Sequence, residues 1–312
     1  MSTAARRWTG SAGEAEPVAT RAERAILRTV AYSALFQAPM TVDELHERLM
    51  DVPLDRAALR RCLDQPFLRA RVIVTDGLVH PLGRHGWVAL RRLRGRRTRA
   101  LLKRHARALR LLARCPFVRL VALSGACAHD NAADDDVDVF LVVERERAWA
   151  VFLLVMLVSK LAGLRRSLCV NYVIDESVLA LPERDVFTAA QIAGLRPLAG
   201  RSVYLRFVAA NAWVAEHFPN FHAAHRARAG DVPEVSPPRW CERLLRCGPA
   251  QVVEAASRRW LGRRLERRAS GHSGVALSAH RLKLHVVDHR PRLLAAWAAA
   301  LAELGEPLEA RR

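Results

Sequence analysis

The sequence predicts an α+β protein with a small mixed sheet and helices at its centre. Three apolar runs of strand length, at residues 118–123, 137–143 and 168–174, are separated by segments with helical spacing. Short helices and a hairpin are expected before these runs, at residues 21–83, and a helical C-terminal region after them, at residues 183–312. With 312 residues and 51% apolar content, the chain is long enough for two or three packed domains.

The chain carries a formal net charge of +19, and arginine supplies nearly all of its positive charge. The lysines are Lys103, Lys160 and Lys283. Such a charge favours polyanionic partners, including nucleic acid. Abundant arginine and alanine are also typical of GC-rich coding sequences. The charge therefore permits a nucleic-acid partner without indicating one.

Cysteine usage and hydropathy predict a cytoplasmic protein with no membrane partner. Six cysteines are scattered without a CxxC pair, and residues 1–17 lack the apolar core of a signal peptide. The most membrane-like stretch, residues 148–158, has eleven uninterrupted apolar residues. A spanning helix needs about 20. We therefore expect a buried helix there.

The N-terminal part of the chain begins with a polar segment, residues 1–20, that we expect to be a disordered tail. Residues 25–36 have the apolar spacing of a helix, and Thr41 with Glu44 forms a capping box that opens a second helix. A third helix is expected at residues 55–63. Strand-like runs then flank Asp76-Gly77, a pair suited to a type I′ hairpin turn.

Three short helices followed by a two-stranded ribbon resemble a winged helix, at residues 21–83. This resemblance implies DNA binding, with Arg56, Arg60 and Arg61 of the third helix in the major groove. The alternative is a module that only packs or presents a substrate within an enzyme.

Residues 84–115 are expected to form a long, arginine-rich connecting helix. Its apolar residues keep helical spacing, so one face packs and the other is charged. That charged face is either solvated or a polyanion-binding ridge beside an active site.

The densest run of acid lies in the loop between the first two expected strands, which holds Asp130, Asn131, Asp134, Asp135 and Asp136. The first strand ends at Ser124-Gly125, a tight turn into a short helix. Because strand side chains alternate between faces, Asp136 and Asp138 point the same way. Two such carboxylates repel each other unless they are protonated, paired with arginine, or holding a hard cation such as Mg²⁺.

These residues resemble the polymerase-beta-like nucleotidyltransferase superfamily. Its signature is an apolar residue, Gly, then Gly or Ser, followed after a spacer by Asp-apolar-Asp-apolar on a strand. The matching residues are Leu123-Ser124-Gly125 and Asp136-Val137-Asp138-Val139, with Ser124 standing where the family usually has its first glycine. The resemblance is specific over residues 118–175 and implies a nucleotidyltransferase-fold catalytic core at residues 116–182.

The resemblance also implies a reaction. A nucleoside monophosphate would pass from a nucleoside triphosphate to an acceptor hydroxyl, with release of pyrophosphate. Asp136 and Asp138 would hold two Mg²⁺ ions, and Ser124 and Gly125 would place backbone N–H groups on the triphosphate. The acceptor stays open between RNA, a small molecule and a protein.

Three further positions are candidate site residues. The family takes a third carboxylate from a later strand, where Asp175 is the candidate catalytic residue and Asn171 the alternative at mid-strand. Asn131 in the acidic loop and Lys283 are candidates for contacting the nucleotide. Lys283 and His285 are polar points among apolar residues that could reach a phosphate or be structural.

The C-terminal region, residues 183–312, is expected to be a helical domain that closes over the nucleotide, as the resemblance implies. The histidines lack zinc-ligand spacing with cysteines, and the sequence has neither a serine-hydrolase elbow nor a Walker-type glycine loop. The alternative function is a winged-helix DNA-binding regulator whose nucleotidyltransferase fold is inactive or senses a ligand.

Overall fold

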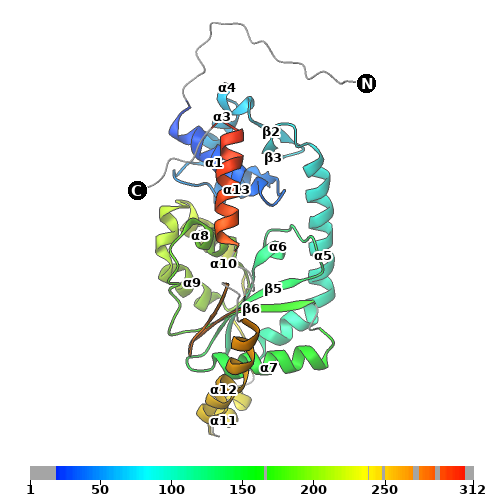
Figure 1. Cartoon of the computed structure of the whole chain (residues 1–312), viewed down its shortest axis with the longest axis vertical. Coiled ribbons are helices and arrows are strands. Elements are labelled where there is room, and N and C mark those ends of the chain that lie inside the picture. Colours follow the sequence, from blue (N-terminus) through cyan, green and yellow to red (C-terminus); the bar gives the residue numbers. More distant parts are fainter. Residues whose placement is uncertain are drawn as a thin grey trace.

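The computed structural model describes residues 19–164, 167–237, 239–247, 250–269, 274–284 and 289–305. The fold is α+β, with a three-stranded sheet near the N-terminus and a six-stranded sheet at the centre (Figure 1). The strands are β1 Met40–Thr41, β2 Val72–Thr75, β3 Leu78–Pro81, β4 Val118–Leu123, β5 Val137–Val143, β6 Leu168–Asp175, β7 Arg196–Ala199, β8 Val275–Leu277 and β9 Arg281–Leu284. The helices are α1 Arg21–Ala34, α2 Val42–Glu47, α3 Arg56–Leu63, α4 Pro66–Arg69, α5 Gly86–Ala113, α6 Gly125–Ala128, α7 Ala148–Leu161, α8 Val186–Gly194, α9 Arg201–Ala210, the 3₁₀ helix η1 Ala212–Glu216, α10 Phe221–Ala229, α11 Arg239–Cys247, α12 Ala250–Ala269 and α13 Arg290–Glu303.

The N-terminal unit contains the predicted helices and hairpin. Thr41 and Glu44 form the expected capping box at α2, which satisfies backbone N–H groups at the start of the helix. In the β2–β3 turn Asp76 and Gly77 both have positive φ, at 50° and 76°, as a type I′ turn requires. Strand β1, which pairs with β3, and the short helix α4 were not predicted. The expected tail at residues 1–18 lies outside the described residues.

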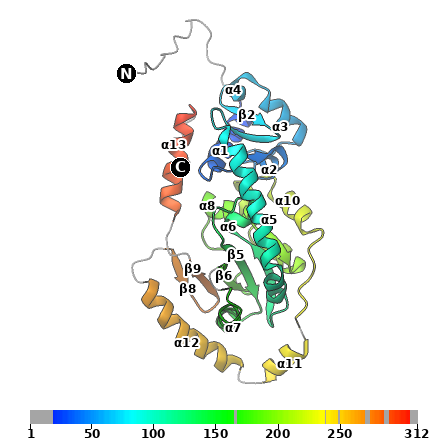
Figure 2. The same cartoon turned by 90° about the vertical axis from the view of Figure 1, so that its right-hand side faces the viewer.

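Helix α5 is the predicted arginine-rich helix and runs from the N-terminal unit along the central sheet (Figure 2). Its apolar face buries Leu101, Leu109 and Leu112 against the central core. At its N-terminal end Arg91 binds the Glu44 carboxylate of α2 at 2.7 Å. The helix therefore joins the N-terminal unit to the sheet by both packing and charge.

The central sheet has the strand order β7-β4-β5-β6-β9-β8. Strands β5 and β6 are parallel and joined through α7, and the other pairs are antiparallel, so the sheet is mixed as predicted. One sheet face, with Val139 and Leu141, packs against α5 and α7. The other face, with Phe140 and Val142, packs against α8 and α9.

The prediction of a purely helical C-terminal region is wrong. Strands β7, β8 and β9 all come from residues 183–312 and join the central sheet, so residues 116–182 supply only three of its six strands. All three strands are short, and β7 and β9 carry arginine or lysine, so hydrophobic alternation gives little signal for them. Helix α13 returns to α1 at the other end of the molecule (Figure 1). There Trp297 Nε1 donates to the Arg28 carbonyl at 3.0 Å.

Helix α7 is buried on one face only, which corrects the expectation of a fully buried helix. Trp149, Phe152 and Val155 lie in the core, whereas Leu157 is 50% and Leu161 87% exposed. Apolar composition alone does not show which face a helix buries. Within the described part of the chain, no helix combines the length and apolar character needed to cross a bilayer.

His225 on α10 makes the fold acid-sensitive. Burial, with the charge of Arg228, lowers the pKa of His225 to about 3. The native state therefore binds fewer protons than the unfolded state between about pH 6.5 and pH 3, and its stability falls as the pH falls through that window, by up to about 1.4 kcal/mol per pH unit. We expect this residue to remove about 2 kcal/mol of unfolding free energy between pH 7 and pH 5.

Urea denaturation at several pH values measures this effect. The His225→Gln variant should show a shallower loss of stability between pH 6.5 and pH 5 than the parent chain, by about one proton. Equal slopes for the parent and His225→Gln would contradict the assignment.

Candidate functional site

The structure places Asp138 near the start of β5, directly beside the turn after β4. The backbone N–H of Ser124 donates to the Asp138 carbonyl at 3.0 Å, which aligns the turn with the strand. The Asn171 side-chain amide on β6 donates to Asp138 Oδ1 at 2.5 Å. The other carboxylate oxygen, Oδ2, faces the backbone of Gly125. Three neighbouring segments of the sheet therefore fix this one carboxyl group.

Gly125 is required at its position by two separate constraints. Its φ of +58° lies in the left-handed region, which side chains disfavour. A Cβ added there would also lie 2.3 Å from Asp138 Oδ2. Ser124 has a φ of −126°, a value any residue adopts readily, so serine is tolerated where the resembled family usually has glycine.

The acidic residues around Asp138 repel one another. Burial, followed by the charges of Asp136 and Asp134, raises the pKa of Asp138 to about 6. Burial and the charges of Asp134 and Asp135 also raise the pKa of Asp136. Within the described residues, neither Asp136 nor Asp138 forms an ion pair with arginine or lysine. Of the three ways to relieve the repulsion, protonation and a bound cation remain.

A cavity of about 130 Å³ opens beside this carboxylate and is lined by Ser124, Gly125 and Asp138. Glu183, Lys283 of β9 and Arg290 of α13 also line it, so the cavity has two carboxylates and two basic groups in its wall. Lys283 lies 3.5 Å from the Glu183 carboxylate, which holds its ammonium group near the cavity. The structure thus brings together four of the predicted site residues, which are Ser124, Gly125, Asp138 and Lys283.

Asp136 lies immediately before β5 and is half-buried rather than enclosed. A hydrogen bond from the Cys169 thiol partly offsets the rise in its pKa. The same acidic surroundings and burial raise the pKa of Cys169 to about 11, so this thiol stays protonated and able to donate. Asp136 is not among the residues that line the Asp138 cavity, but its charge lies close enough to raise the pKa of Asp138.

The prediction that Asp175 joins these carboxylates is wrong. Asp175 pairs in register with Val143 at the far end of β5, whereas Asp138 pairs with Cys169. It is 0% exposed and accepts hydrogen bonds from the Glu146 backbone at 2.9 Å and His280 Nδ1 at 2.7 Å. These contacts, with those from Ser177, outweigh burial and lower its pKa, as expected for a structural carboxylate.

A β-bulge in β6 explains the error. Val139 pairs with Val170 and Phe140 with Tyr172, so Asn171 is an extra residue in the ladder. Val170 and Val173 consequently face the same core, and strict alternation fails across this point. Asn171, the alternative position, contacts Asp138.

Asn131 was expected to contact the nucleotide, but it does not line the Asp138 cavity. Its amide donates to the Phe36 carbonyl at 3.1 Å, and its Oδ1 accepts from Arg94 at 3.4 Å. Asn131 lines a second cavity, which meets the Asp138 cavity at Gly125 and Gln191. The other candidate for contacting a phosphate, His285, lies outside the described residues.

Several cavity residues gave no signal in the sequence. Glu183 follows the expected end of the core, yet it binds Arg281 at 3.0 Å and Lys283 at 3.5 Å. Arg290 begins α13 and reaches the cavity only because that helix returns to the N-terminal unit. These residues come from segments distant in sequence, which local patterns do not connect.

The Gly125→Ala substitution should destabilise the protein by about 2 kcal/mol or more. An alanine there must adopt a left-handed backbone conformation, and its Cβ must press against Asp138, so both effects raise the energy of the native state. Urea denaturation gives the value. In the Asp138→Ala background the same substitution should cost only about 1 kcal/mol, because the clash with Oδ2 is gone.

Gly86→Ala provides the matched control for this cycle. Gly86 has no positive φ and no atom within 4 Å of an added Cβ, so its substitution should be neutral or slightly stabilising. If Gly125→Ala lowers the free energy of unfolding equally with and without the Asp138 carboxylate, that result would contradict the close contact.

The cavity combines a glycine turn, a repelling carboxylate pair and basic residues from the C-terminal segments. No family model, curated protein or solved structure matches this chain. What the cavity does must therefore be argued from its own residues and geometry.

Proposed function

We propose that the protein is a magnesium-dependent nucleotidyltransferase that moves a nucleoside monophosphate from a nucleoside triphosphate to an acceptor hydroxyl. One observation carries this proposal. The Asp138 carboxylate lies against the Gly125 backbone in a cavity that also contains basic side chains, and among the described residues neither it nor Asp136 has a basic ion-pair partner. A carboxylate pair kept free of arginine is available to a divalent cation.

The surrounding architecture supports the proposal. Strand β4, the Ser124-Gly125 turn, α6 and β5 follow one another in the order that the resemblance implies. The parallel pair β5 and β6 with its α7 connection continues this arrangement. The helices α1 to α3 with the β2–β3 hairpin likewise support a winged helix at the N-terminus.

The residues around Asp138 fit a magnesium ion in their chemistry. The donor set is all oxygen, with the carboxylates of Asp136 and Asp138 and the hydroxyl of Ser124 nearby. Asn171 contributes an amide in place of a third carboxylate. Within the described residues no group of three or more His, Cys, Asp or Glu side chains is arranged for a metal, so the two aspartates would share the site with substrate phosphates. Bound magnesium would neutralise phosphate charge and lower the pKa of the acceptor hydroxyl.

The protein's own residues would position the nucleotide. Lys283 and Arg290 offer positive charge to the phosphates from the cavity wall. Tyr172, Phe187 and Phe207 line the cavity and would contact the part of the nucleotide that enters it, since a volume of about 130 Å³ admits only one portion of such a molecule. With a pKa of about 6, Asp138 is mostly ionised at neutral pH, as a cation ligand must be. Catalysis would then come mainly from positioning and charge neutralisation.

A DNA-binding regulator remains the second candidate because of α3. Arg60 and Arg61 are exposed on this helix, and neither side chain has an ion-pair partner among the described residues. Arg56, the third expected contact, is bound to Asp43 at 2.6 Å. At the tip of the hairpin, Asp76 adds negative charge and is bound to Arg92 at 2.9 Å. Two free arginines and an acidic tip give this surface less phosphate affinity than the sequence implied.

Calorimetry with each of the four nucleoside triphosphates, with and without Mg²⁺, tests the proposed function. At least one triphosphate should bind in a Mg²⁺-dependent manner, and the Asp136→Asn/Asp138→Asn variant should lose this binding. The control is Asp135→Asn, which removes an exposed carboxylate paired with Arg97 from the same loop and should bind normally. Equal binding by parent and double variant, or no binding at all, would remove the catalytic assignment.

The Asn171→Asp variant tests the metal site separately. Without metal it should lose about 1–3 kcal/mol of stability, because a hydrogen bond to Asp138 is replaced by a like charge. Mg²⁺ should then raise its melting temperature more than that of the parent chain. Combining it with Asp138→Asn should abolish this difference, whereas a melting temperature indifferent to Mg²⁺ in Asn171→Asp would argue against a cation at Asp138.

A further inference from the structure

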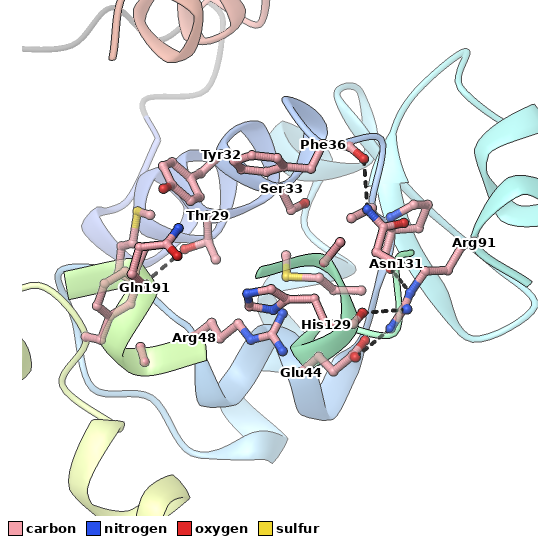
Figure 3. Close-up of a pocket in the computed structure, with 18 of the residues that line it drawn as sticks. Thr29, Tyr32, Ser33, Phe36, Glu44, Arg48, Arg91, His129, Asn131 and Gln191 are labelled. Carbon is pink, nitrogen blue, oxygen red and sulfur yellow. Dashed lines mark hydrogen bonds and ion pairs between the residues drawn. The ribbon is translucent and has the colours of Figure 1, made fainter. Parts of the chain in front are cut away.

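A second cavity, of about 190 Å³, lies on the other side of Gly125 from the Asp138 cavity. Helices α1, α2, α6 and α8 surround it, and Figure 3 shows the side chains that line it. Its wall is largely apolar and includes Tyr32, Phe36, Met40 and Phe218. An apolar protein cavity of about 150 Å³ holds one benzene molecule. This cavity therefore has room for a ring-sized apolar group together with a small substituent.

Two guanidinium groups line this cavity, and their surroundings differ. Arg91 is fully engaged, because it binds the Glu44 carboxylate at 2.7 Å and donates to the backbone carbonyls of His129 at 2.7 Å and Pro39 at 3.2 Å. Arg48 has a buried Nε with no partner, and no hydrogen bond or ion pair from another described residue reaches its side chain. Figure 3 shows Arg48 beside His129, with Glu44 turned to Arg91.

The carboxylates nearest to Arg48 are already occupied. Glu44 is bound to Arg91, and Glu47 is bound to Arg228 at 2.6 Å. Burial lowers the pKa of Arg48 to about 10 in spite of these carboxylates, so the guanidinium is still charged at neutral pH. Burial and the neighbouring arginines lower the pKa of His129 well below its ordinary value, so His129 adds no charge. The cavity thus holds one unneutralised positive charge.

A second buried polar atom in this wall also lacks a partner. The Tyr32 hydroxyl is buried without a hydrogen bond, and burial raises its pKa, so it is a neutral donor. A buried donor with no acceptor lowers stability, as does a buried charge with no counter-charge. An oxyanion in the cavity would relieve the Arg48 charge, and an apolar ligand alone would not.

We propose that this cavity binds a small organic carboxylate or phosphate ester, with its anionic group on Arg48 and its apolar body against Tyr32 and Phe36. A metal cation is excluded as the occupant by the charge of Arg48. A neutral apolar molecule would leave that charge unpaired. This site uses none of the residues that would hold magnesium, so its binding can be tested whether or not the Asp138 cavity proves active.

Benzoate and phenyl phosphate are the test probes, and benzyl alcohol is the neutral comparison of similar size. Ligand-observed NMR titration of the full chain should show both anions binding with about millimolar affinity, as expected for molecules of this size. Benzyl alcohol should bind at least tenfold more weakly. Equal binding of benzyl alcohol and benzoate, or no binding of either anion, would overturn the proposal.

Variants at Arg48 show whether the guanidinium is the anion site. Arg48→Met keeps an unbranched side chain as far as the position of Nε and removes the charge, and it should weaken anion binding by about ten- to a hundredfold. Arg48→Lys keeps the charge and should retain part of the affinity. Arg60→Gln removes an exposed arginine of the N-terminal unit that has no ion-pair partner within the described ranges, and this variant should bind the anions as the parent does.

The melting temperature of the ligand-free protein is a second measurement, and it distinguishes an anion-binding Arg48 from an Arg48 that only supports the fold. Removing an unpaired buried charge should raise the melting temperature of Arg48→Met above that of the parent chain. A lower melting temperature for Arg48→Met, or unchanged anion affinity, would show that Arg48 serves the fold and would overturn the proposal. Because Arg48→Lys retains the charge, it separates loss of the anion site from a general folding defect.

Discussion

The close contact between the Gly125 backbone and the Asp138 carboxylate sets the arrangement of the centre of this protein. It requires a residue without a Cβ at position 125 and a left-handed backbone there. The contact is possible because β4 and β5 are antiparallel neighbours, with Leu123 opposite Val139. The turn after β4 therefore lies directly against the start of β5, and α6 carries that turn between two cavities.

The rest of the fold supports this contact from both sides. On one sheet face α5 and α7 bury Val139 and its neighbours, and on the other α8 and α9 cover Phe140. Burial on both faces fixes the register of β5, since a slip of one residue would move Asp138 into an apolar core. Strand β9 pairs with the outer edge of β6 and carries Lys283 to the cavity. The C-terminal segments complete the sheet and the site together.

Much of the fold and part of the candidate site could be predicted because the sequence patterns that indicate them are local. The three central strands, the type I′ hairpin and the arginine-rich helix each lie within one continuous segment whose spacing indicates the element. The acidic pair and its glycine turn likewise lie within about twenty residues of each other, a span that one motif covers. In the candidate site, Ser124, Gly125 and Asp138 were found in this way.

The features that escaped prediction depend on contacts between distant segments. The bulge at Asn171 moves Asp175 away from the Asp138 face, and nothing in the composition of β6 marks the extra residue. Strand β7 is an edge strand, and β9 lies between β6 and the short edge strand β8. The arginine and lysine residues of β7 and β9 hide the alternation that identifies buried strands. Arg48 is ordinary in sequence, and its isolation arises because Glu44 and Glu47 of the same helix bind arginines from α5 and α10.

The two cavities share one electrostatic feature, which is how their charged side chains are paired. Charges that serve the fold are paired, as Arg119 is with Glu242 and Asp175 is with His280. On either side of the Gly125 turn, by contrast, Asp138 and Arg48 line cavities and have no ion-pair partner of opposite charge in the described part of the chain. Pairing them with each other is prevented by the α6 turn between them. A half-buried carboxylate and a buried guanidinium both lower stability when unpaired, and such a loss is understandable where each charge has a ligand of opposite sign to bind.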